Sequence, residues 1–123
     1  MAYKIGDKAH GGIVFDVDDS GEHGWVATET DQATEATWHE ALEICSELED
    51  GGYRDWVLPS KIQIDTMIRN LLKNGLSEFR GIWYWSSTEY DNDKAWGEFL
   101  MGPPSSGYNS KDSIGFVRPI RAF

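Results

Sequence analysis

Tyr84-Trp85-Ser86-Ser87-Thr88-Glu89 is the segment of this sequence that most narrows the choice of fold. Trp83 and Trp85 have the same parity in an extended chain, whereas Tyr84 has the opposite one. This aromatic, β-prone run predicts a strand over residues 82–87, with Trp85 in the core. Trp38 and Trp56 are also expected to be core residues, because they lie in segments that predict regular structure.

The rest of the last third of the chain also predicts β-structure. No helical period is found beyond residue 80, and residues 95–101 and 116–122 have the composition of strands. Residues 102–110, rich in Gly, Pro, Ser and Asn, are expected to form a loop. Arg118 and Arg121 are three positions apart, which places them on opposite faces of a strand. One of them is therefore expected to be partly buried, with a carboxylate such as Asp55 as its partner.

The first half of the chain predicts a hairpin followed by two helices. Residues 13–17 and 25–27 are β-prone runs separated by turn residues. Two capping boxes follow, in which paired side chains satisfy each other's backbone N–H groups. The pairs are Thr37 with Glu40 and Ser60 with Gln63. Apolar residues then recur at helical spacing over residues 38–48 and 64–72. The order of hairpin, two helices and then strands predicts an α+β fold.

The composition limits the number of domains and the classes of partner. A chain of 123 residues, 40% of them hydrophobic, is long enough for one domain spanning residues 1–123 and too short for two separate cores. The net charge of −10 argues against nucleic acid, which is bound through clustered Lys and Arg. No apolar run approaches the length of a membrane span, and the N-terminus lacks the pattern of a signal peptide. We therefore expect no nucleic acid and no membrane insertion.

The order of several short segments resembles the Lcl C-terminal domain family, named after a bacterial collagen-like adhesin and belonging to the C-type lectin clan. The segments are Gly11-Gly12-Ile13-Val14-Phe15 with Gly21-Glu22-His23-Gly24, Gly51-Gly52-Tyr53 through Leu58-Pro59-Ser60, Tyr84 to Glu89, Ala95-Trp96, and Val117 to Arg121. The resemblance covers nearly the whole chain. It implies a C-type lectin-like fold with two helices on antiparallel sheets, adjacent chain ends and a long C-terminal loop region that binds ligand.

A narrower resemblance concerns the variable proteins of diversity-generating retroelements, many of which come from gut bacteria and their phages. It rests on Ser86-Ser87-Thr88-Glu89, the polar stretch that follows, Ala95-Trp96 and the closing residues 117–123. In those proteins scattered surface positions are rewritten while the framework is kept. The corresponding positions here would be Tyr90, Asp91, Asn92, Asp93, Glu98 and the loop over residues 103–113.

These patterns predict recognition by non-covalent contacts. Tyr90 and Tyr108 lie in polar segments and are expected to supply exposed apolar area. The residues expected to set polar specificity are Asp91, Asn92, Asp93, Glu98, Asn109, Lys111 and Asp112. The expected partner is a cell-surface protein or glycan, bound by a phage receptor-binding protein or a bacterial adhesin at the virion or the cell surface. The alternative is a structural virion or assembly module, for which a trimer covering the same loops would be evidence.

Catalysis, cofactors and metals are not predicted. His10, His23 and His39 lie in three different elements, whereas a zinc site needs several ligands close together. The Glu-Pro-Asn, Gln-Pro-Asp and Trp-Asn-Asp motifs of calcium-dependent lectins are absent, which leaves a weak cation site at acidic turns as the alternative. Cys45 lies on the apolar face of the first predicted helix, so an enzyme related to formylglycine-generating enzymes is the least favoured interpretation.

Overall fold

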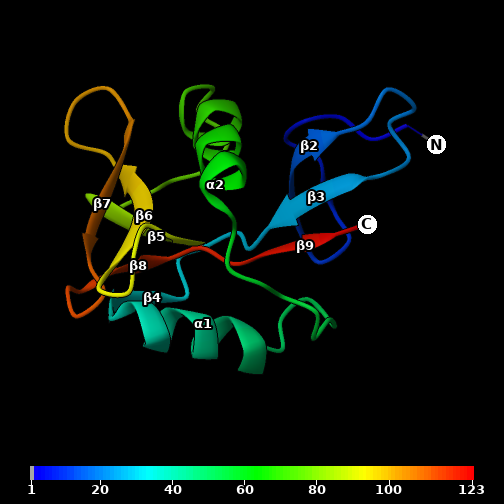
Figure 1. Ribbon diagram of the computed structural model, residues 1–123. Helices are drawn as coiled ribbons and strands as arrows, with labels where there is room; N and C mark the ends of the chain where they lie inside the picture. Colours follow the sequence, from blue (N-terminus) through cyan, green and yellow to red (C-terminus); the bar gives the residue numbers. More distant parts are fainter. Residues whose placement is uncertain (1) are drawn as a thin grey trace.

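The computed structural model describes residues 2–123 and confirms the predicted α+β class (Figure 1). Its helices are α1 (Trp38–Glu47) and α2 (Lys61–Met67), the second continued by the π-helical segment η1 (Ile68–Leu72). The strands are β1 (Lys8–Ala9), β2 (Gly12–Val17), β3 (Gly24–Ala27), β4 (Ala33–Ala36), β5 (Trp83–Glu89), β6 (Lys94–Phe99), β7 (Ser105–Ser110), β8 (Gly115–Val117) and β9 (Ile120–Ala122). No helix within residues 2–123 is both long and apolar enough to cross a membrane.

The strands form two sheets that lie next to each other. One has the order β1-β2-β3-β9 and the other β4-β8-β5-β6-β7. Neighbouring strands run antiparallel except for β5 and β8, which meet in parallel at Tyr84 and Phe116. Figure 1 shows β8 and β9 as one continuous path from the five-stranded sheet to the four-stranded one, with α1 and α2 on opposite sides of the strands.

The final segment splits between the sheets, which corrects the single strand predicted over residues 116–122. β8 belongs to the five-stranded sheet, whereas β9 pairs with β3 beside the N-terminal hairpin. Pro119 stands at the break, and it has no N–H to donate to a ladder. The expected neighbourhood of the chain ends is confirmed, because the rings of Tyr3 and Phe123 lie 5.5 Å apart.

Both predicted capping boxes are present. The Thr37 side chain accepts the Glu40 N–H, and the Glu40 carboxylate accepts the Thr37 N–H at 2.9 Å. Ser60 and Gln63 make the same exchange at the start of α2. Each box satisfies two N–H groups that a helix start leaves without a partner. The helix starts are therefore fixed by local sequence.

The strand β5 is buried on both faces, because a helix covers each of them. Trp83 and Trp85 pack with the apolar side of α1, whereas Tyr84 packs on the other side with α2 and η1. The Trp85 indole N–H donates to the Ala36 carbonyl at 2.8 Å. The predicted core positions of Trp38, Trp56 and Trp85 are thus confirmed.

Both C-terminal arginines are buried, rather than one of them. Arg121 donates from Nε to Asp55 at 2.6 Å, which is the ion pair with Asp55 expected for one of the two arginines. The Arg121 side chain is 9% exposed and the Asp55 side chain 61% exposed, so the pair lies at the surface edge of the four-stranded sheet. Arg118 is paired elsewhere, as described below.

Candidate functional site

The hairpin of β6 and β7 presents one face to solvent beside α2. The two strands pair without interruption from Lys94 with Ser110 to Phe99 with Ser105. The loop predicted over residues 102–110 is therefore wrong for residues 105–110, which form β7. Pairing along six residues of β6 outweighs the weak strand preference of Ser, Gly and Asn. In this register Trp96 lies directly opposite Tyr108.

Three aromatic side chains gather at the end of this hairpin, and we call Tyr90, Trp96 and Tyr108 the aromatic cluster. Tyr90 and Tyr108 stack with ring centroids 4.0 Å apart and an interplanar angle of 11°. Trp96 meets both edge-on, at 5.5 and 5.4 Å. Tyr90 is 47% exposed and Tyr108 44%, so the stack is open to solvent. Lys61 of α2 lies over the Trp96 ring, with Nζ 3.7 Å from the centroid.

The turn between β5 and β6 carries the acidic residues next to this cluster. Asp91 Oδ1 accepts the backbone N–H groups of Asp93 and Lys94, both at 2.8 Å. These hydrogen bonds, that from Asp93 first, lower the pKa of Asp91. Asp91, Asn92 and Asp93 are all exposed. Asp91 therefore shapes the turn that holds Tyr90 in place, and the turn displays polar groups beside the two rings.

Lys111 is buried, which corrects its expected place on the exposed surface. Its ammonium donates to Glu89 at 2.8 Å and to the Asn92 carbonyl at 3.0 Å. It also lies 4.5 Å from the centroid of the Trp38 ring. These contacts tie the β5–β6 turn to the end of β7 and to α1. The physical reason is that a long side chain can bury its stem and still reach carbonyl and carboxylate partners.

Glu98 is also buried, with 0% exposure, so its expected surface position is corrected. It follows Trp96 by two residues on the same face of β6, but α2 covers the sheet at this point. The Ser106 hydroxyl donates to Glu98 Oε2 at 3.2 Å. Burial raises the pKa of Glu98 to about 7.

The remaining predicted residues are Asn109, which lies in β7, and Asp112, which lies in the turn after it. Asn109 is half-buried and pairs with Ala95, which faces the tryptophan core, so Asn109 lies on the side opposite Tyr108. Asp112 is exposed in the turn that follows β7. The Lys111 backbone N–H donates to the Asp93 carbonyl at 2.8 Å, which places this turn beside the β5–β6 turn. The structure thus brings together Tyr90, Tyr108, the acidic β5–β6 turn and the turn after β7.

Two residues of this surface are not predicted from the sequence. Trp96 lies in a framework segment, yet it is half-buried and completes the aromatic cluster. Its parity with Lys94 on β6 is the signal that could have placed it on a solvent-facing side. Lys61 has no comparable signal, because only the packing of α2 on the sheet brings it to Trp96.

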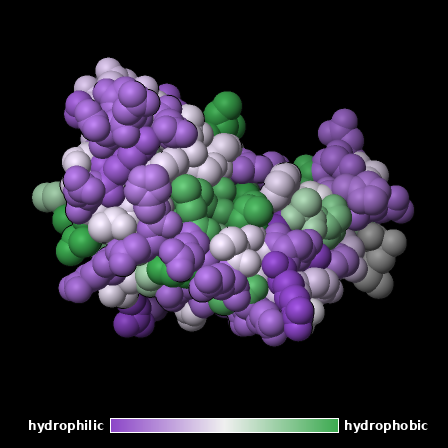
Figure 2. Space-filling view, turned by 60° about the horizontal axis from the view of Figure 1, so that its bottom comes forward, coloured by the Kyte–Doolittle hydropathy of each residue, from purple (hydrophilic) through white to green (hydrophobic). Residues whose placement is uncertain are grey.

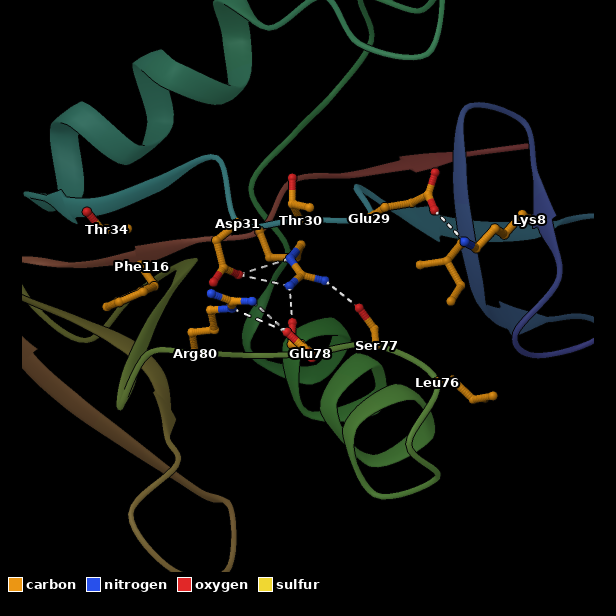
Figure 3. Close-up of a pocket in the computed structure, with 12 residues that line it drawn as sticks. Lys8, Glu29, Thr30, Asp31, Thr34, Leu76, Ser77, Glu78, Arg80 and Phe116 are labelled. Atoms are coloured by element: carbon orange, nitrogen blue, oxygen red, sulfur yellow. Dashed lines mark hydrogen bonds and ion pairs between the residues drawn. The ribbon is translucent and has the colours of Figure 1, made fainter.

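A cavity of about 490 Å³ lies between the sheets (Figure 3). Asp31, Ser77 and Glu78 converge there on the guanidinium of Arg118. Arg118 also donates to the Thr28 carbonyl, so all five of its N–H groups are used. A guanidinium with no free donor holds the structure together and has none to offer a ligand. We therefore assign Arg118 a structural role.

The surface is hydrophilic over most of the face shown in Figure 2, where apolar residues form separate small groups. The large apolar residues exposed among residues 2–123 are dispersed over the chain, and the two tyrosines of the aromatic cluster are among them. Single exposed apolar residues are ordinary on protein surfaces, whereas grouped aromatic rings mark contact sites. The aromatic cluster is therefore a better candidate for the binding site than the cavity around Arg118.

Removal of calcium is expected to leave the protein unchanged. Across residues 2–123, no three His, Cys, Asp or Glu side chains are placed to hold one metal ion. Calcium requires several oxygen ligands, and the Asp91 carboxylate already accepts two backbone N–H groups. Melting temperatures measured with EDTA and with millimolar Ca²⁺ should therefore agree. A stoichiometric Ca²⁺ site found by calorimetry would contradict this prediction.

A known protein family matches most of the chain. The family model of the Lcl C-terminal domain matches residues 17–121 of the chain. No curated protein matches the sequence. The matched range contains both helices, β5 to β8 and the whole aromatic cluster.

Proposed function

The chain belongs to the Lcl C-terminal domain family, whose members are adhesin-type or ligand-binding domains, and from this we propose a non-catalytic recognition function located at the aromatic cluster. The observation that carries the proposal is the exposed stack of Tyr90 on Tyr108. Rings already held against each other lose little freedom when a ligand covers them. They also offer apolar area with a hydroxyl at the edge, which suits protein and glycan partners alike.

The proposed partner is a receptor on a cell surface, a protein or a glycan. The protein would act as a phage receptor-binding protein or a bacterial adhesin, on a virion or at the cell surface. Tyr90, Asn92 and Asp93 are the positions most suited to diversification by a retroelement, because their side chains are exposed in a turn. The turn itself is held by backbone hydrogen bonds between Tyr90, Asp91 and Lys94.

Two other functions make different predictions. A structural virion or assembly module would bury the aromatic cluster in a homo-oligomer, so that a trimer in solution would shield Tyr90 and Tyr108. An enzyme would need an activated group. Burial raises the pKa of the Cys45 thiol to about 12, and a protonated thiol is a poor nucleophile. This supports the non-catalytic proposal.

Changing Tyr90 or Tyr108 to alanine is expected to weaken binding by ~1–3 kcal/mol, the usual range for an interface anchor. The free energy of unfolding should fall by about 1 kcal/mol or less, because the stack is half exposed. Binding is measured on an array of glycans and by pull-down from host cell surfaces, followed by titration of the partner found.

Val57→Ala is the matched control, since Val57 is also 47% exposed but follows Trp56, away from the hairpin. It should leave binding unchanged. If the two tyrosine variants melt early while affinity per folded molecule stays intact, the β6–β7 face is scaffold. A trimer whose contacts cover both rings would favour the structural module.

A further inference from the structure

Glu98 stands out among the buried side chains because one of its oxygens has no hydrogen-bond donor within residues 2–123. Oε2 accepts from the Ser106 hydroxyl across the β6–β7 ladder. Oε1 is fully buried and is the oxygen that lacks a donor. A buried carboxylate oxygen without a donor is costly, because it has lost its hydration without replacement. An orphan oxygen of this kind calls for a physical explanation.

The group that faces this carboxyl from α2 is a second carboxyl, that of Asp65. Asp65 and Ser106, the donor to Glu98, line one recess between α2 and β7, and burial, followed by the charge of Asp65, raises the pKa of Glu98. Asp65 also accepts from Arg69 of η1 at 2.8 Å. Asp65 and Arg69, with Lys61 at the start of α2, line a recess of about 350 Å³ that is open to solvent. Protons can therefore reach the pair through this recess.

The other neighbours of Glu98 supply no free charge. Tyr84 of β5 pairs with Glu98 in the sheet, but its hydroxyl is engaged with Asp31 and the Gly81 N–H. Ser106 of β7 is neutral. The positive charge of Arg69 is held by Asp65, at 2.8 Å. Two carboxylates would repel each other at this contact, whereas one proton between them converts the repulsion into an O–H···O hydrogen bond.

We propose that Glu98 and Asp65 share one proton in mildly acidic solution and that this proton fastens α2 to β6 and β7. The Glu98 carboxyl donates its proton from Oε1 to Asp65. Asp65 then keeps its charge for the ion pair with Arg69, and Oε1 is no longer without a hydrogen-bond partner. This inference concerns the stability of the fold and does not rest on the proposed function. Protonation of the pair also affects the aromatic cluster, because Lys61 of α2 lies over Trp96, two residues before Glu98.

The direction of the pH effect follows from the raised pKa. An unfolded chain gives Glu98 its ordinary pKa of 4.5, whereas burial, followed by the charge of Asp65, raises the folded value to about 7. The contribution of the shared proton is fully present below pH 4.5 and is lost as the pH rises to about 7. Above that pH both states have lost the proton, and stability no longer changes through this pair.

Urea unfolding of the wild type and of Glu98→Gln between pH 4.5 and pH 8.5 tests the proposal. Glutamine keeps the donor to Asp65 and does not titrate. Relative to Glu98→Gln, the unfolding constant of the wild type should rise on the order of 100-fold across this range, since each unit of pKa difference is a factor of ten. Glu43→Gln, which removes an exposed carboxylate from α1, is the matched control and should keep the wild-type pH dependence.

A direct titration keeps the test decisive if Glu98→Gln folds poorly. Carboxyl-carbon NMR of the wild type should show one glutamate titrating near pH 7, and Asp65→Asn should bring that midpoint toward the ordinary value. The indole N–H signal of Trp96 should move with the same midpoint, because Lys61 changes position with α2. If every glutamate titrates near its ordinary pKa, or if Glu98→Gln keeps the pH dependence of the wild type, the proposal is overturned.

Discussion

Replacing Trp85 with alanine is expected to destabilise the protein by ~3–5 kcal/mol, enough to unfold much of a marginally stable chain. The side chain is 0% exposed and packs edge-on against Trp83 at 5.3 Å. Its removal leaves a cavity between β5 and α1 and an Ala36 carbonyl without its donor. The measurement is the free energy of unfolding from urea titration.

Trp85→Phe separates packing from hydrogen bonding. Phenylalanine fills most of the space but cannot donate to Ala36, so a smaller loss of ~1–3 kcal/mol is expected from the unpaired carbonyl and the missing ring. Ligand binding per folded molecule should be unchanged in both variants, because Trp85 faces the core and not the aromatic cluster. A Trp85→Ala protein that loses less than about 1 kcal/mol would contradict the core position.

Arg118→Met is expected to cost ~3–5 kcal/mol, because it leaves a buried carboxylate without its counter-charge. The Arg118 side chain is 0% exposed and its partner Asp31 is 9% exposed. The change also removes the donors for three further acceptors, Thr28, Ser77 and Glu78. The loss is measured as the shift in the urea midpoint.

Arg80→Met is the matched control, since Arg80 lines the same cavity but is 79% exposed and pairs with the exposed carboxylate of Glu78. Its effect should stay within about 0.5 kcal/mol. The double variant Arg118→Met with Asp31→Leu should recover part of the loss, because it removes the stranded charge. If Arg118→Met and Arg80→Met are equally stable, the network around Arg118 contributes nothing to the stability of the fold.

Features fixed by neighbouring residues could be predicted from the sequence. The starts of α1 and α2 follow from capping boxes three residues long, and the opposite facing of Tyr84 and Trp85 follows from strand parity. The pairing of one C-terminal arginine with Asp55 was expected because a buried guanidinium needs an anion, and the structure gives this role to Arg121. Each of these depends on a short stretch of chain or on one general requirement.

Features fixed by the packing of distant segments could not be predicted. The polar residues of β7 form a strand because β6 supplies backbone partners, and no local signal marks them. Glu98 and Trp96 share one face of β6, yet α2 covers the first and leaves the second half open. The burial of Lys111 has no sequence signal, because it depends on contact with the turn after β5. The exposure of Tyr90 and Tyr108 was expected, but their stacking depends on two turns meeting.

The meeting of the chain ends has a consequence for how such a unit can be attached. Tyr3 and Phe123 lie side by side, and Figure 1 shows β9 and the first strands at one end of the molecule with β7 at the other. A carrier protein joined at either end, or at both through a single surface loop, would hold the aromatic cluster outward at the distal tip. Grafting into a host loop would need little added linker, since the two attachment points are already adjacent. The architecture is therefore suited to presenting the aromatic cluster at the surface of a carrier protein.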